Sequence, residues 1–174
     1  ADSLRGPVDL STNYRCGLLV EGEPGAPMLM MPHNPKHYAQ WLEAAGLEKA
    51  KDLLALRATK QTLDLSRIDR IVQRVQQKSR AVVRRMNLKR FGDEMRIVWD
   101  LYNRIWERNW GFVPMSEAEF FAHSKDLAKV ARPELMHIAE IDGKPVGFAA
   151  ALPDVNRGTK ACNGKLLPFG WWKF

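Results

Sequence analysis

The sequence predicts an α+β protein with a mixed, mostly antiparallel sheet flanked by helices. Two patterns support this prediction. Short apolar runs are bounded by glycine, proline or an Asp-Gly pair, as strands are, and longer segments carry an apolar residue every three or four positions, as amphipathic helices do. The 174 residues, of which 45% are hydrophobic, are enough for one core or two small ones.

The first 59 residues are expected to form a strand–turn–strand unit, a helix and a further strand. Residues 17–22 and 27–32 are apolar runs bounded by glycines and prolines. The next segment has a capping residue, Asn34, with Pro35 at the first helical position and Gly46 after the last turn. The apolar stripe of this helix consists of Tyr38, Trp41, Leu42 and Ala45. Residues 52–59 are predicted to be the following strand.

A second amphipathic helix is predicted over residues 63–79. Ser66 and Asp69 have the spacing of a capping box. The expected buried stripe is Ile68, Ile71, Val72 and Val75. Another face carries Arg67, Arg70, Arg74 and Lys78.

The rest of the chain predicts a strand, two helices and a hairpin. The strand covers residues 80–86, and a helix follows from about 90 to 108. Ser116 and Glu119 form a capping box for the second helix. Strands at 136–141 and 146–152 flank Asp142-Gly143, a dipeptide that tolerates the positive φ angles of a tight hairpin turn.

These strands are expected to share one sheet, which is completed within the chain or by another copy. An incomplete sheet leaves open edges, and three large aromatic residues lie close together near the C-terminus: Phe169, Trp171 and Trp172. Both features favour a homo-oligomer.

Composition suggests a cytoplasmic protein with no membrane partner. No apolar run approaches the roughly 18 residues of a membrane span, and the N-terminal residues have no apolar stretch typical of a signal peptide. Cys16 and Cys162 are far apart and form no CxxC pair, so two inert thiols in a reducing compartment are expected.

Several of these segments resemble the GNAT superfamily of acyl-CoA N-acyltransferases. Residues 80–153, with the hairpin IAEIDGKPVGFAAAL, resemble the N-terminal half of that fold. The first 59 residues, with Asn34, Ala39 and Gly46 in the helix, resemble its C-terminal half. GPVDLST, MMPHNPKHY, NWGFVP and LLPFGW are similar to an uncharacterised bacterial group in which two such domains adjoin.

The resemblance divides the chain into residues 1–59, the end of one domain, a basic helix or linker at 60–79, and residues 80–174, the start of the next. One compact domain over the whole chain is the alternative. The resemblance also implies attack of an amine on the thioester of acetyl-CoA or another acyl-CoA, with a small molecule or other amine as acceptor.

Two departures from the family pattern bear on activity. The pyrophosphate-binding turn [QR]-x-x-G-x-[GA] is missing from the chain, and Leu42 stands where many members have a tyrosine acid. We therefore expect no cofactor site in this chain and no turnover by it alone. Whether it is a fragment of a longer protein stays open; an R-x-x-G-x-G sequence beyond Phe174 would show a complete enzyme.

Three aromatic residues are the substrate-binding candidates, because the resembled fold has its acceptor groove beside this helix and turn: Trp106, Trp110 and Phe112. Packing in the core is the alternative role for them. His33 and His37 are spaced like metal ligands, but no third ligand is suggested, so no metal is expected. No catalytic residue is assigned.

The basic residues offer a different function. Residues 66–90 contain nine basic residues and one acid, whereas the whole chain has a net charge of +7. The alternative to an acyltransferase is a binding module for nucleic acid or an acidic protein through the stretch Arg67–Arg90, with Arg67, Arg70, Arg74 and Lys78 as its anion-binding residues. The stretch has no aromatic residue for base stacking, and a solvated basic face is the simpler interpretation.

Overall fold

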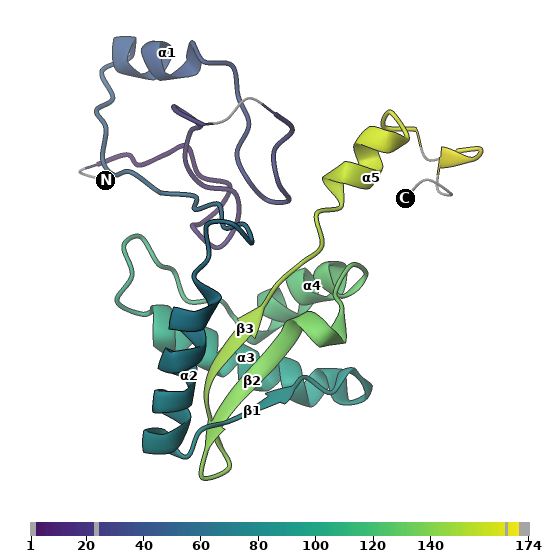
Figure 1. Cartoon of the computed structure of the whole chain (residues 1–174). Helices are drawn as coiled ribbons and strands as arrows, with labels where there is room; N and C mark the ends of the chain where they lie inside the picture. The colour runs from purple at the N-terminus through teal and green to yellow at the C-terminus, as the bar shows by residue number, and fades with distance from the viewer. Residues whose placement is uncertain (1–2, 23–24, 166, 171–174) are drawn as a thin grey trace. The chain divides into compact units, whose positions relative to one another are not determined.

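A computed structural model describes residues 3–22, 25–165 and 167–170 of the chain (Figure 1). The chain divides into two units, which are considered separately. Unit 1 comprises residues 1–53, 108–113 and 154–174, and unit 2 comprises residues 54–107 and 114–153. The regular secondary structure is concentrated in unit 2.

Unit 2 contains an antiparallel three-stranded sheet in the order β1-β2-β3, with β1 at Val82–Arg85, β2 at Met136–Ile141 and β3 at Lys144–Ala150. Arg84 lies opposite Ile138, and Ile138 lies opposite Phe148. The hairpin between β2 and β3 turns at Asp142 and Gly143, which have φ angles of 49° and 74°. The Asp-Gly prediction is therefore confirmed, and the positive φ angles explain why this dipeptide forms the turn.

Helix α3, at Phe91–Trp106, supplies half of the buried apolar residues of unit 2. Its buried apolar residues are Met95, Val98 and Leu101. Met95 and Val98 form a cluster with Met86 and the fully buried Ile138. In Figure 1, α3 and α4 lie behind the sheet, on one of its faces. The apolar residues on one side of α3, spaced by about 3.6 residues, thus pack on the apolar residues on one face of β2, spaced by two.

Helix α4, at Glu117–Ala128, begins where the sequence predicts. The Ser116 hydroxyl accepts a hydrogen bond from the Glu119 backbone N–H at 3.2 Å, which satisfies one of the unpaired donors of the first turn. Two short 3₁₀ segments, Leu88–Arg90 and Pro133–Leu135, connect the elements. Just before α4, the backbone of Met115 is bonded to the side chains of Trp99 and Asn103 from α3.

Helix α2, at Leu65–Ser79, forms as predicted but differs in its cap and its packing. The cap is Asp64, whose carboxylate accepts from the Arg67 N–H at 3.0 Å, and Ser66 donates to this carboxylate instead of forming a capping box with Asp69. The stripe expected to be buried is exposed, with Ile68, Ile71, Val72 and Val75 at 41–53% exposure. The amphipathic pattern predicts the stripe, but no element of unit 2 buries it.

Unit 1 has little regular structure: helix α1 at Tyr38–Ala44, helix α5 at Asn156–Ala161 and an isolated bridge between Val8 and Cys16. The strands expected at 17–22 and 27–32 are absent from the described residues of these runs. The Asn34 side chain explains the first case, because it bonds both the N–H and the C=O of Leu19, the groups that a partner strand needs. In the second run a turn at Met30, with a φ angle of 63°, interrupts the extended chain.

The helix expected from Asn34 onward is shorter than predicted. Asn34 is not its cap, because its side chain is occupied by Leu19, and α1 begins at Tyr38. Gly46 adopts the predicted left-handed conformation, with a φ angle of 85°. Tyr38 and Trp41 of the expected buried stripe are exposed.

The strand expected at 52–59 does not form either. Leu54 and Leu56 are 84% and 91% exposed, and this segment is not part of the sheet. A run of leucines has strand character only when a neighbour pairs with its backbone. Of the predicted terminal aromatic cluster, Phe169 is exposed, whereas Trp171 and Trp172 lie outside the described residues.

Candidate functional site

The most organised polar group of the molecule is an ion-pair cluster in unit 2, formed by Arg84 of β1, Glu94 of α3 and Glu140 of β2. The Arg84 Nη1 lies 2.9 Å and 3.0 Å from the two carboxylate oxygens of Glu94. Its Nε donates to Glu140 Oε1 at 2.7 Å. The side chains of Glu94 and Arg84 are 8% and 31% exposed, so the cluster lies mostly beneath the surface.

The local sequence explains why these charges meet. Arg84 is two residues before the buried Met86, and Glu140 is two residues after the buried Ile138, so both point to the covered face of the sheet. Glu94 is three residues after Phe91 and one before Met95, on the buried face of α3. This cluster was not predicted from the sequence. The available signal was that the opposite charges of Arg84, Glu94 and Glu140 occur at the same periodic spacing as nearby core residues.

The electrostatics keep Arg84 a cation. The hydrogen bond that Arg84 donates to Glu140 raises the pKa of Arg84 above its ordinary value, partial burial opposes this rise, and Glu94 adds to it. Burial also raises the pKa of Tyr102, on α3. Removing one partner of the cluster would leave a poorly solvated charge. The cluster is therefore a structural brace that joins β1, β2 and α3.

The three predicted substrate-binding residues are divided between the two units. Trp106 is the last residue of α3 in unit 2, with its ring 5.9 Å from that of Tyr102. Trp110 and Phe112 belong to the segment 108–113 of unit 1. Trp106 and Trp110 are both at least 40% exposed, so neither is a core residue.

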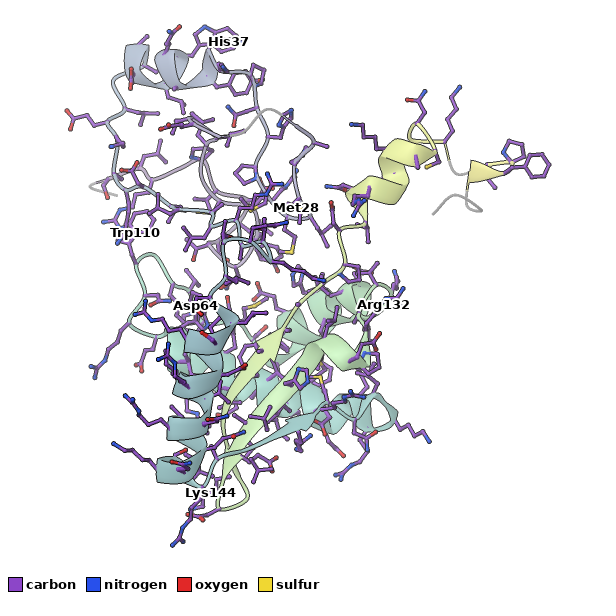
Figure 2. All side chains as sticks on the ribbon, in the orientation of Figure 1. Met28, His37, Asp64, Trp110, Arg132 and Lys144 are labelled. Carbon is purple, nitrogen blue, oxygen red and sulfur yellow. The ribbon has the colours of Figure 1, made fainter. Side chains whose placement is uncertain are left out.

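The turn that carries Trp110 is held by hydrogen bonds within unit 1. Thr12 Oγ1 donates to the Gly111 carbonyl and Asn13 Nδ2 to the Val113 carbonyl, both at 2.8 Å. Gly111 has a φ angle of 68°, and a Cβ there would lie 3.1 Å from the Thr12 methyl group. The guanidinium of Arg5 and the ammonium of Lys51 lie 6.0 Å and 5.8 Å from the centre of the Trp110 ring (labelled in Figure 2).

The four predicted anion-binding residues do share one face of α2: Arg67, Arg70, Arg74 and Lys78. All four are exposed, and within the part of the chain that the structure describes none of them pairs with a carboxylate. Arg84 and Arg90 of the same basic stretch differ, because they pair with Glu94 and Glu140 and with Asp93. The four residues of α2 therefore form one exposed basic face.

No group of three metal-ligating side chains occurs among the residues with a described placement. The His37 ring lies 4.2 Å from that of Trp41 and 5.3 Å from that of Tyr38. Cys162 is buried, and its thiol lies 3.3 Å from the Thr159 carbonyl oxygen. These contacts place His37 in an aromatic cluster and give the Cys162 thiol a hydrogen-bond acceptor.

An open cavity of about 340 Å³ lies beside α5 in unit 1 and is lined by Ala26, Asp154, Asn156, Arg157 and Lys160. Asn156 bonds the Pro27 carbonyl there. The lining is mainly polar, and one carboxylate offsets part of the positive charge of two cations. The sequence analysis assigned no role to this region.

The chain is similar to two curated bacterial proteins. It is 37% identical to protein YghO of Escherichia coli (strain K12) over 174 residues, which is 99% of this chain and 44% of that protein. It is 38% identical to the bacterial ceramide synthase of Caulobacter vibrioides (strain NA1000 / CB15N) over 168 residues, 97% of this chain and 44% of that protein. The chain thus spans less than half the length of these relatives. No protein-family profile and no solved structure matches it.

Proposed function

We propose that this chain is part of an N-acyltransferase that joins an acyl group to the amine of a long-chain base. The observation that carries the proposal is the 38% identity, over 97% of the chain, to a protein named bacterial ceramide synthase. A ceramide is the amide of a fatty acid and a long-chain amino alcohol, so its synthesis requires acyl transfer to nitrogen.

The resemblance to the GNAT superfamily supports the same chemistry independently. It rests on the residues of β1, α3, α4 and the β2–β3 hairpin, which unit 2 arranges as an antiparallel sheet covered by helices. In that superfamily the amine attacks an acyl-CoA thioester directly. We propose that unit 2 has this fold and that the whole protein uses an acyl-CoA donor.

The sequence predicts no cofactor site in this chain and an acceptor-side role for Trp110, but the surroundings of Trp110 lead us to propose this residue for contact with the donor instead. Its indole ring is partly exposed, and two cations, Arg5 and Lys51, lie 6.0 Å and 5.8 Å from its centre. Positive charge repels a substrate ammonium group and attracts phosphate. The surface therefore suits an acyl-CoA better than a long-chain amine. Trp106 and Phe112 remain our proposed acceptor-side residues.

Thermal unfolding with palmitoyl-CoA, CoA or sphinganine tests the proposal. A ligand at about 100 times its Kd adds about 2.7 kcal/mol of stability, which is several degrees in Tm for a chain of this size. We expect stabilisation by palmitoyl-CoA that Trp110→Leu reduces and that Trp41→Leu, an exposed tryptophan of the same unit, leaves unchanged. The absence of any shift with palmitoyl-CoA and sphinganine would favour the binding-module function.

Turnover by this chain alone is a separate measurement. We expect CoA-thiol release at the rate without enzyme, because the pyrophosphate turn is missing from the sequence and Leu42 replaces the usual acid. General acid catalysis alone contributes roughly 100- to 10,000-fold. Thiol release clearly above background, lost on substitution within this chain, would contradict this expectation.

A further inference from the structure

Helix α2 has an apolar face that no element of unit 2 buries. Its aliphatic residues occupy an arc of roughly 120° at 3.6 residues per turn. They are Leu65, Ile68, Ile71, Val72 and Val75, and each is more than 40% exposed. No residue of α2 is buried, so a large part of this apolar surface faces solvent.

A basic face lies directly beside the apolar one. Arg67, Arg70, Arg74 and Lys78 occupy a further arc of roughly 80°, and Lys78 is adjacent to Ile71 around the helix axis. Asp69 is the one acidic residue in α2. The only contact that the structure gives these four head groups is a 3.3 Å hydrogen bond from Arg70 to the Ser66 carbonyl, among the residues described. The four cations are therefore available to an external anion.

We propose that α2 lies on an anionic lipid surface, with its aliphatic arc in the headgroup–acyl boundary and its cations on the lipid phosphates. A bilayer rich in anionic lipid presents both an apolar and a negative environment at one boundary, which matches the two adjacent faces. Long basic side chains beside an apolar face extend their head groups toward the phosphates while their methylenes stay in the apolar region.

Charge and composition favour lipid over other partners. A second copy of α2 would cover the aliphatic arc but bring four more cations close to the first four. Nucleic acid would neutralise the cations, but the aliphatic arc would stay exposed, and α2 has no aromatic residue to stack on bases. An anionic bilayer accounts for both faces at once.

The helix lies on the membrane and does not cross it. Fifteen residues of α-helix span only about 22 Å, which is shorter than the roughly 30 Å of the hydrocarbon core. In the portion of the chain with described coordinates, no helix has the length and apolar character for a transmembrane segment. This proposal replaces the expectation of no membrane partner. That expectation assumed that the aliphatic arc is buried, whereas the structure exposes it. It rests on α2 alone and does not depend on acyl transfer.

Flotation of the whole chain with vesicles tests the proposal. We expect partitioning onto phosphatidylcholine vesicles that contain phosphatidylglycerol, little onto pure phosphatidylcholine, and a marked loss at high salt. Each cation near such a surface contributes about 1 kcal/mol, or roughly fivefold, so Arg70→Gln/Arg74→Gln should weaken partitioning roughly 30-fold. Ile71→Ser/Val75→Ser should weaken it roughly tenfold or more at every salt concentration.

The matched control removes two cations elsewhere in unit 2. Lys125→Gln/Lys144→Gln, on α4 and at the hairpin, should change partitioning by less than about twofold. Hydrogen exchange should show vesicle-dependent protection of α2 and none of α3. Circular dichroism confirms that each variant folds.

Three outcomes would overturn the proposal. The first is equal loss of partitioning in the control and in the α2 variants. The second is binding of a single-stranded oligonucleotide that Ile71→Ser/Val75→Ser leaves intact while vesicles do not bind. The third is an oligomer that this double variant dissociates, with no protection of α2 by vesicles.

Discussion

Helices α2 and α3 are nearly equal in length and both have an apolar stripe, but only α3 buries it. In α3 the stripe packs on Ile138 and Met86 of the sheet. In α2 every residue remains partly or fully exposed. The difference teaches that an amphipathic period predicts a helix and its face, whereas what the face contacts depends on elements far away in the sequence.

The two helices also differ in whether their charged side chains are paired. Glu94 of α3 lies on the buried face and is paired by Arg84 from a neighbouring strand. The cations of α2 lie on a solvent face without such partners.

Arg84→Met should destabilise unit 2 by about 3–5 kcal/mol, because it leaves the carboxylate of Glu94 buried without its counter-ion. The measurement is the free energy of unfolding from urea titration. Arg85→Met is the matched control: it is the next residue of β1, exposed on the opposite face, and should stay within about 0.5 kcal/mol. Equal losses in the two variants would show that the ion-pair cluster is not a brace.

Leu101→Ala in α3 should cost about 3 kcal/mol, because the side chain is 2% exposed and its removal leaves a cavity. Ile71→Ala in α2 should change stability by less than about 0.5 kcal/mol, since alanine favours helix and little packing is lost. The pair is compared by the same urea titration. A loss at Ile71 as large as at Leu101 would mean that the aliphatic arc of α2 is packed against something in solution.

Ser116→Ala should destabilise the protein by about 1 kcal/mol, since it removes the acceptor for the Glu119 N–H at the start of α4. Ser116→Asp, which restores an acceptor, should recover most of this loss. Differential scanning calorimetry would detect both changes. Failure of Ser116→Asp to recover stability would argue against a capping role.

The smallest effect concerns the pH dependence of α2. The hydrogen bond from the Ser66 hydroxyl lowers the pKa of Asp64 below its ordinary value, and the bond from the Arg67 N–H lowers it further by a smaller amount (Asp64 is labelled in Figure 2). The stability that this ionised cap contributes is therefore fully present above the ordinary pKa of an aspartate, and it is lost as the pH falls through the lowered pKa of Asp64. Ser66→Ala should raise the pKa of Asp64 in an NMR titration. An unchanged pKa would mean that the hydroxyl does not bond Asp64 in solution.

The sequence determined those features that depend on neighbouring residues. The Asp142-Gly143 hairpin, the Ser116 cap, the left-handed Gly46 and the helices at 65–79 and 91–106 all follow from local backbone preferences and short-range hydrogen bonds. These interactions form within a few residues, so a single sequence is enough to predict them.

Which apolar runs pair as strands, and which charged side chains form ion pairs, depends on the tertiary structure. Residues 17–22 resemble a strand in sequence, yet Asn34 takes the hydrogen bonds of Leu19. Arg84 and Arg74 belong to the same basic stretch, yet Arg84 meets carboxylates 10 and 56 residues away while Arg74 meets none of the described ones. The physical reason is that pairing and burial require partners distant along the chain, and local pattern does not say where those partners lie.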